Sequence, residues 1–257
     1  MSHSLFLALL IVPVLALVVL DFRRAAPASR AAAGFLGVVL LVYFVIQALC
    51  ARLAPGPFDV VRTSALPTWA AVPIALYASG LVDYLVHRFF SHARPFFFTH
   101  EYHHLPSEVW LLMPGLAARP FAVVATVPVT LATGAIAGSV PAMRVVVLLQ
   151  ALLLVTSHSS FLREFRGLHL AMTRLGLTTP REHLLHHSAT LRGNYANLTT
   201  IWDRAFGTYL DPDVHEPGKL GLPYDQDWLG AITLSRFKLP AWVRARFDVG
   251  RWCNLDA

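Results

Sequence analysis

The chain has 257 residues, of which 56% are hydrophobic and only 14% are charged, and its mean hydropathy is +0.55. Soluble domains carry about 25% charged residues, so this composition excludes an ordinary soluble domain and indicates a protein of the lipid bilayer. The net charge of +6 does not indicate a nucleic-acid-binding protein, because the sequence contains no nucleic-acid-binding motif. Contact with anionic lipid headgroups explains why a membrane protein would be basic.

Five apolar stretches are long enough to cross a bilayer or to enter it deeply. We expect them at about 4–20, 33–54, 67–86, 120–140 and 143–158. The last two are alternatively the arms of one re-entrant hairpin. The first has no basic residue before it and is followed by Arg23 and Arg24, which favours a retained anchor over a cleaved signal peptide.

The arginines are distributed unevenly between the expected loops. The loops after the first, third and fifth apolar stretches are richer in arginine than the two loops between them. The positive-inside rule therefore places those loops and the C-terminus in the cytoplasm, together with two histidine-rich repeats at 99–104 and 182–187. The N-terminus is then outside. Cys50 and Cys253 then lie on opposite sides of the membrane, so we expect no disulfide between them.

The predicted fold class is all-α, an integral membrane protein with four or five apolar helices and a cytosolic histidine-rich helical cap. We expect a single domain, 1–257. Its membrane helices and the first two of its histidine-rich motifs occupy about 1–160. The cap occupies about 161–210, and a loosely structured tail with one short helix near 226–237 occupies about 211–257.

Two copies of a His-x-x-His-His motif stand out, in "THEYHH" at 99–104 and "EHLLHH" at 182–187. Neutral imidazole is a common ligand of transition metals. Positions i, i+3 and i+4 share one face of a helix, so the three imidazoles of each copy can point into one site. These imidazoles are His100, His103, His104, His183, His186 and His187. Six imidazoles exceed what one tetrahedral zinc accepts, which indicates two metal ions.

Three further histidines lie at the inner ends of apolar stretches. His87 and His92, in "HRFFSH", are five residues apart and would point about 140° apart on a regular helix. They are therefore expected either to bind different metals or to flank a distortion of the helix. His158 lies at a matching depth after the fifth stretch and brings the number of candidate ligands to nine. We expect His169 to be structural, and His3 and His215 to be incidental.

The start of the cap and two carboxylates also have expected roles. A helix is expected to begin at Thr178 or Thr179, just before Pro180. Asp83 lies four residues before His87, where it could hold the second nitrogen of a ligand imidazole; the alternative is an interfacial hydrogen bond to Tyr or Arg. Asp203 could do the same for the second repeat, and its alternatives are a salt bridge to the next residue, an arginine, or a helix cap.

A set of nine histidines suits iron as well as zinc. A pair of irons can take electrons one at a time and cleave dioxygen beside a C–H bond. A dry site reached from the bilayer would exclude water and admit an apolar substrate. This reasoning favours an oxygenase that acts on a lipid.

The motifs resemble those of the fatty acid hydroxylase superfamily, also called the sterol desaturase family. The resemblance covers about 80–211, where "DYLVHRFFSH", "FFFTHEYHHLPSE" and "TPREHLLHHSATLRGNYANLTTIWDRAFGTYLDP" are similar to its three histidine boxes and "SHSS" to its isolated histidine. The first box is spaced as in acyl 2-hydroxylases and carotenoid hydroxylases, whereas the third resembles sterol desaturases, so the substrate class stays open. The family ligands would be His87, His92, His100, His103, His104, His158, His183, His186 and His187.

The resemblance implies a non-haem di-iron centre that uses O2 to hydroxylate a membrane lipid. The alternative hypothesis is desaturation of the lipid by the same centre. Zinc can replace iron during overexpression. Because the sequence contains no haem-binding cytochrome domain, electrons are expected from a separate ferredoxin- or cytochrome-type donor and its reductase. Two hypotheses from other functional classes stay open. One is a zinc-dependent membrane hydrolase with Glu101 or Glu182 as general base, and the other is a non-catalytic metal-binding scaffold.

Overall fold

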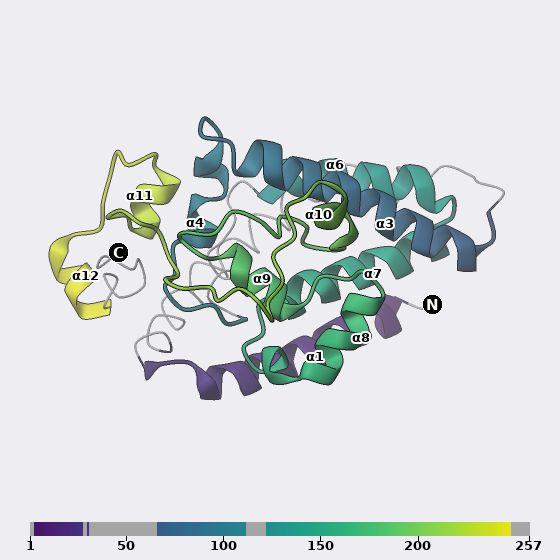
Figure 1. The fold of residues 1–257 in the computed structure, drawn as a ribbon, viewed down its shortest axis with the longest axis horizontal. Helices are drawn as coiled ribbons and strands as arrows, with labels where there is room; N and C mark the ends of the chain where they lie inside the picture. The colour runs from purple at the N-terminus through teal and green to yellow at the C-terminus, as the bar shows by residue number, and fades with distance from the viewer. Residues whose placement is uncertain (1–2, 28–29, 31–65, 112–121, 248–257) are drawn as a thin grey trace.

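A computed structural model shows how the chain is arranged (Figure 1). It describes residues 3–27, 30, 66–111 and 122–247, with side chains from residue 11 onward except at 122–125, 228, 232 and 245–247. Within these ranges all regular structure is helical, and only two isolated β-bridges join extended segments. The expected all-α class is therefore confirmed for the described part of the chain.

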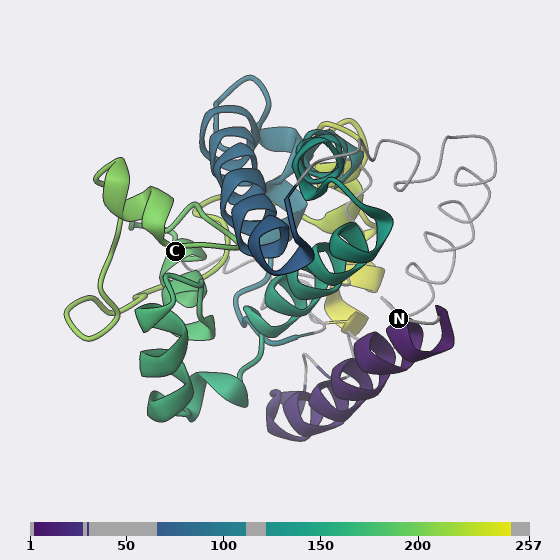
Figure 2. The same ribbon diagram turned by 90° about the vertical axis from the view of Figure 1, so that its right-hand side faces the viewer.

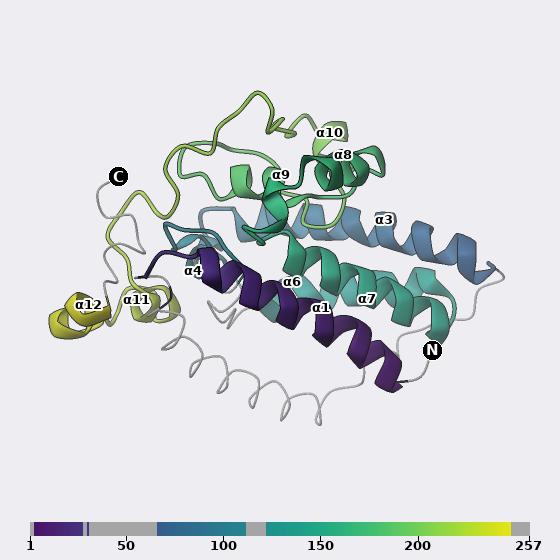
Figure 3. The ribbon, with the colours of Figure 1, turned by 90° about the horizontal axis from the view of Figure 1, so that it is seen from below.

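Four long helices form the body of the part of the molecule that the structure describes. They are α1 (His3–Arg24), α3 (Thr68–Val86), α6 (Ala122–Ala137) and α7 (Val140–Thr156). Figure 3 shows them running lengthwise, and Figure 2 looks along α3, α6 and α7. They correspond to four of the five expected apolar stretches. The fifth, 33–54, lies outside the described residues.

One described helix is long and apolar enough to cross a membrane. It is the continuous helix Thr68–Ser91, with 24 residues, whereas Thr126–Ala137 and Val140–Thr156 are apolar but shorter. The last two are separate helices joined by a short turn, in which Ser139 caps α7 by accepting a hydrogen bond from the Ala142 amide.

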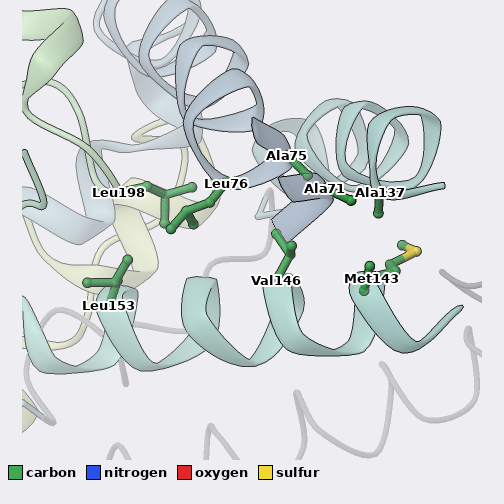
Figure 4. Packing of buried hydrophobic residues seen from close by; sticks show 9 residues of the cluster. Ala71, Ala75, Leu76, Ala137, Met143, Val146, Leu153 and Leu198 are labelled. Carbon is green, nitrogen blue, oxygen red and sulfur yellow. The ribbon is translucent and has the colours of Figure 1, made fainter. Parts of the chain in front are cut away.

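Small side chains allow the long helices to pack closely. Ala71 and Ala75 of α3 are fully buried and face Ala137 of α6 and Met143 and Val146 of α7 (Figure 4). Alanine at such positions lets two helix backbones approach, which is the usual basis of helix packing in membranes.

A buried amide links three of these helices. The Nε2 atom of Gln150 on α7 donates to Ser79 Oγ on α3 at 2.8 Å and to Thr133 Oγ1 on α6 at 2.9 Å. The Gln150 amide therefore has two hydrogen-bond partners inside an apolar bundle, where an unpaired amide would be costly.

The cap packs on one side of the long helices. It contains η3 (Leu162–Glu164), α8 (Arg166–Arg174), α9 (Pro180–His186) and α10 (Ile201–Ala205), and Figures 1 and 3 show α8, α9 and α10 together on that side. Trp202 donates from Nε1 to the Tyr77 carbonyl of α3 at 2.9 Å. A Cβ atom at Gly80 would lie 2.6 Å from Thr199 Oγ1, so glycine is what lets α3 and the segment before α10 touch.

Helix α9 begins as its sequence predicts. Thr179 is the N-cap, its hydroxyl accepts from the Glu182 amide, and the Glu182 carboxylate accepts from the Thr179 amide. Pro180 is the first residue of the helix. This capping box fixes where the second His-x-x-His-His copy starts its helical turns.

The short helix expected near 226–237 is observed, and the described part of 211–257 contains one helix more than expected. Two helices occur there, α11 (Trp228–Ile232) and α12 (Ala241–Phe247), beyond one end of the long helices (Figure 3). Asp227 is fully buried; its carboxylate caps α11 at the Gly230 amide and accepts from the Leu239 amide. Tyr224 and Gln226 donate to Glu101 within the second histidine motif, so this segment packs against the candidate site.

Candidate metal centre

The first histidine motif lies on a π-helical turn at the end of α3. In this turn, η1 (His87–Ser91), the His92 amide donates to the His87 carbonyl at 3.1 Å. An i to i+5 turn brings residues five apart onto the same side of the helix. His87 and His92 therefore lie together, with ring centroids 4.9 Å apart. Of the two expected explanations for their spacing, the helix distortion is observed, and binding to different metals is not what the geometry favours.

The second motif follows a 3₁₀ turn, η2 (Phe97–Thr99), and occupies the short helix α4 (Glu101–His104). The third occupies α9, and His158 follows the end of α7. All nine candidate ligands come together in two groups, and within each group the ligand atoms lie within 4.8 Å of one another. The five-histidine group is His87, His92, His100, His104 and His186. The four-histidine group is His103, His158, His183 and His187.

The division of the two repeats corrects one expectation. Each His-x-x-His-His copy was expected to direct its three imidazoles into one site, but each copy serves both groups. The first copy gives its i and i+4 members to the five-histidine group and its i+3 member, His103, to the other. The second copy does the reverse, with only its i+3 member, His186, in the five-histidine group. On a helix, i and i+4 are about 40° apart, whereas i+3 points about 60° to the other side.

The two groups are enclosed to different degrees. All four members of the four-histidine group are buried, whereas His92 and His100 of the five-histidine group are half-buried. Burial lowers the pKa of His186 to about 4 and holds the pKa values of His104, His183 and His187 well below the usual range of histidine. These imidazoles are therefore neutral at pH 7, which is the form that binds a metal.

Imidazole nitrogens face one another at short distance within each group. His183 and His158 have Nε2 atoms 2.9 Å apart, and those of His87 and His100 are 2.8 Å apart. His104 Nε2 is buried and has no hydrogen-bond partner among the described residues. A buried polar atom without a partner costs free energy unless something binds it. Convergent neutral imidazoles with an orphaned nitrogen are the donor set expected of a transition-metal site.

The outer nitrogens of several imidazoles are held by backbone carbonyls. The Nδ1 atom of His186 lies 3.1 Å from the Gly193 carbonyl oxygen, and that of His158 lies 3.1 Å from the Leu154 carbonyl oxygen. His87 Nδ1 contacts the Tyr195 carbonyl oxygen. A hydrogen bond from Nδ1 leaves Nε2 unprotonated and aims it into the group.

These observations agree with a comparison against protein families. The model described as "Fatty acid hydroxylase" matches residues 72–208, which is just over half of the 257 residues. The chain belongs to the fatty acid hydroxylase family. No curated protein and no solved structure matched it. The matched region contains all nine histidines, so the family resemblance noted from the histidine boxes is confirmed.

In this family member Asp83 is linked to the candidate metal ligand His87 by way of Asn197. Its carboxylate accepts from the backbone amide of Asn197 at 3.0 Å and from Asn197 Nδ2 at 3.1 Å. Asn197 Nδ2 also lies 3.1 Å from His87 Nδ1. Asp83 therefore holds Asn197 beside the His87 imidazole.

Asp203 supports a different motif from the one expected. Its carboxylate accepts from the amides of Tyr195 and Ala196 at 2.8 and 2.9 Å and from Thr208 Oγ1 at 2.7 Å. It thereby fixes the backbone whose Tyr195 carbonyl contacts His87, in the first histidine motif, whereas Asp203 was expected beside the second His-x-x-His-His copy at 183–187. Burial raises the pKa of Asp203 to about 6, although these hydrogen bonds act in the opposite direction.

We predict that Asp83→Asn and Asn197→Ala each lower metal affinity and turnover by about 10–100-fold, because the Asp83–Asn197 pair holds the segment whose Tyr195 carbonyl orients the His87 imidazole. Because Asp83 acts through Asn197, the double variant should be no worse than the more impaired single variant. Metal titration of the three purified variants measures this. Additive losses would show that the two residues act separately.

Asp21, near the end of α1, is a buried residue that sequence reasoning missed. Its Oδ1 atom accepts from Ser159 Oγ at 3.0 Å and from the Phe161 amide at 2.8 Å. Its Oδ2 atom accepts from the amides of Leu111 and Ser160 at 2.9 and 3.1 Å. One carboxylate thus joins the chain that follows α4 to the turn that carries His158. A charge at the end of a long apolar helix was the available signal.

The remaining candidates have structural contacts. His169 is buried, its Nδ1 atom lies 2.9 Å from Thr179 Oγ1, and it belongs to neither group, as expected of a structural histidine. His215 contacts the Asp211 carbonyl and also lies outside both groups, whereas the side chain of His3 lies outside the described residues. Glu182 accepts from the Tyr209 hydroxyl at 2.9 Å and closes the capping box.

Proposed function

We propose that this chain is an integral membrane oxygenase that hydroxylates a C–H bond of a lipid, using O2 and a pair of iron ions. The observation that carries the proposal is the pair of interlocked imidazole groups, each suited to one ion and each built from both His-x-x-His-His copies. Two irons held there would take up electrons singly and activate O2 for attack on a C–H bond.

The residues around the ions have definable tasks. The nine imidazoles bind the ions in neutral form, and the burial of seven of them limits the access of water to the centre. The carbonyls of Leu154, Gly193 and Tyr195 orient His158, His186 and His87. Electrons would come from a separate donor protein of the ferredoxin or cytochrome type with its reductase.

A cavity of about 470 Å³ connects this centre to the outside. It meets the five-histidine group at His92, His104 and His186, and no member of the four-histidine group lines it. We therefore propose that the substrate approaches the ion of the five-histidine group, while the second ion stays enclosed. Exposed apolar residues of the long helices, such as Val12, Leu15, Trp69 and Leu131, favour a bilayer around the bundle.

The proposed topology is multi-pass, with both His-x-x-His-His copies at the cytoplasmic face and the cap covering the ends of the membrane helices. It is supported by the arginine distribution and by the apolar helix Thr68–Ser91. In this arrangement 1–160 is the membrane part, 161–210 is the cap and 211–257 is the tail, in which Tyr224 and Gln226 contact Glu101 of the second motif.

A zinc hydrolase is disfavoured by the contacts of its two candidate bases. Glu182 accepts hydrogen bonds from Thr179 and Tyr209, and Glu101 accepts them from Tyr224 and Gln226. Both carboxylates are therefore occupied by structural donors, and neither lines the cavity beside the five-histidine group.

The test is lipid mass spectrometry of cells that express the wild-type chain or the His183→Ala variant. Hydroxylation adds one oxygen to a lipid, whereas desaturation removes two hydrogens, so the two reactions of this scaffold are separated by mass. We expect a lipid with one added oxygen in the wild type alone. Identical lipid profiles in the presence of O2 and an electron donor would contradict the proposal.

Fully loaded protein should hold close to two metal ions per chain, one for each histidine group. Iron is expected in the active form, although zinc can displace it because imidazole sites bind zinc more tightly than Fe(II). Elemental analysis after reconstitution with Fe(II) measures the ratio. Chelation should abolish oxidation, and Fe(II) but not Zn(II) should restore it. One ion per chain at saturation would refute the dinuclear site.

A further inference from the structure

The cavity beside the five-histidine group is lined by two arginines and by several apolar side chains. Arg94 and Arg192 line it together with Phe97, Leu191 and Leu222. Among the residues that the structure describes, no Asp or Glu lines it. Its volume of about 470 Å³ is within the range of small-molecule sites, about 300–1,000 Å³. A cavity with this lining suits a molecule that has an apolar body and a negatively charged end.

The two arginines of the cavity differ from several other arginines of the chain in having no ion-pair partner among the described residues. Arg166 and Arg181 both pair with Asp213, and Arg244 pairs with Asp225. Arg94 and Arg192, by contrast, are exposed and form no hydrogen bond or ion pair with any residue that the structure describes. Their guanidinium groups keep all their donors, and guanidinium is the side chain best suited to carboxylate and phosphate oxygens.

The backbone holds Arg192 in place beside the metal ligands. Ser188 Oγ accepts from the Leu191 amide at 3.2 Å on one side of it. On the other side, a Cβ atom at Gly193 would lie 2.4 Å from the Thr208 carbonyl oxygen, so this residue is wedged between segments. The Gly193 carbonyl also accepts from His186. Arg192 is therefore one residue away from a group that orients a ligand of the five-histidine group.

Arg94 is positioned by the first histidine motif. It follows His92 by two residues, in the turn where the Ala93 amide donates to the Phe90 carbonyl and the Ala93 carbonyl accepts from Phe96. His92 and Arg94 both line the cavity. The two arginines thus come from different histidine motifs. Arg94 follows the candidate ligand His92, and Arg192 precedes the residue whose carbonyl orients His186.

We propose that Arg94 and Arg192 bind the anionic end of a single-chain lipid, a carboxylate or a phosphate monoester, whose chain lies along the apolar walls toward the five-histidine group. This inference rests on the proposed function for the fate of the lipid, but its binding can be measured separately. Charge-assisted hydrogen bonds from guanidinium to an anion are the strong class of hydrogen bond, so the charged end should add clearly to affinity.

The test compares two fluorescent probes of the same chain, cis-parinaric acid and cis-parinaryl alcohol, on the full-length metal-loaded protein in a non-ionic detergent. The wild type should bind the acid at least about tenfold more tightly than the alcohol. The double variant Arg94→Gln/Arg192→Gln should lose this preference and keep its affinity for the alcohol. The control Arg174→Gln/Arg236→Gln removes the same charge from exposed positions outside the cavity and should behave as wild type.

Further arms identify the anion and its source. Hexadecyl phosphate and palmitate should both displace the acid, whereas inorganic phosphate and acetate at the same concentrations should not. Displacement by the free anions would show that the arginines bind small ions and would overturn the lipid assignment. Equal affinity of the wild type for acid and alcohol would also overturn it, and this comparison needs no variant. Equal loss in the control variant would show a diffuse surface effect and not a site.

The outcome is separable from that of the proposed function. If the protein prefers the acid but forms no oxidised lipid, oxygenase activity fails and the binding site stands. If oxidised lipid forms while both probes bind equally, the oxygenase stands and the role of Arg94 and Arg192 fails. An acidic electron-donor protein docked at these arginines would give the second result.

Discussion

The His183→Ala variant is expected to retain close to one metal ion per chain and to lose lipid oxidation by more than about 100-fold, beyond the cost of losing an outer partner. His183 belongs to the four-histidine group and is fully buried, so its loss leaves three imidazoles where a closed site uses four. The ion of the five-histidine group keeps all its ligands. Elemental analysis and product mass spectrometry on the same preparation measure both effects.

The matching change in the other group sharpens this result. His104→Ala removes one of five imidazoles and leaves four, so it should keep more metal than His183→Ala. It should still impair oxidation severely, because His104 lines the cavity where the substrate is proposed to approach. Metal content that falls equally in the two variants would contradict the unequal groups.

His215→Ala is the control for both changes, since His215 lies outside the two groups and contacts only the Asp211 carbonyl among its described partners. It should keep wild-type metal content and activity. Metal binding and stability are coupled, so the thermal midpoint of each variant has to be measured with and without metal. Full activity of His183→Ala would remove the four-histidine group from the catalytic centre.

The candidate ligands could be identified from the sequence, but their division into two histidine groups could not. Spacing places three imidazoles of a motif on one helix face, which is a local property. Whether His103 groups with His100 or with His183 depends on how α4 and α9 face each other across the site, and that follows from tertiary packing. The pattern is regular in hindsight, because in both copies the i+3 residue is the one that crosses over.

The supporting groups were harder to foresee for a physical reason. Many are backbone atoms, such as the carbonyls of Leu154, Gly193 and Tyr195, which carry no sequence signal of their own. Asp83 and Asp203 were identified as acids near the motifs, but both act through the segment that holds Tyr195 and Asn197. That segment reaches α3 only because Gly80 permits the contact.

The helices themselves were predictable wherever the apolar pattern is long or a cap is explicit. The stretches near 67–86 and 143–158 and the start of α9 at Thr179 are all observed within a few residues. Residues 220–231 were not foreseen as part of the site, because Pro and Gly in that region indicate loops. Their role depends on long-range contacts to Glu101, which no local pattern reveals.

The Asp21→Asn variant is expected to lose metal from the four-histidine group while it keeps the ion of the other group. Each carboxylate oxygen of Asp21 accepts two hydrogen bonds, and the amide nitrogen of asparagine cannot accept the pair it would face. Two buried donors would be left without partners, at about 1–3 kcal/mol each. We therefore expect the free energy of unfolding to fall by roughly 2–6 kcal/mol and the thermal midpoint by about 5 °C or more.

The selective loss follows from where the four bonds lead. Leu111 lies on the chain that leaves α4 after His103, and Ser159 follows His158 directly, so Asp21 holds together two segments that each bring one ligand to the four-histidine group. Asp213→Asn removes the same charge from an exposed pair with Arg166 and Arg181 and should change neither metal content nor stability appreciably. If Asp21→Asn lowered the thermal midpoint but kept both ions, Asp21 would only stabilise the fold. If it kept one ion, helix α1, which lies outside the matched region 72–208, would be part of the machinery that positions the metal ligands.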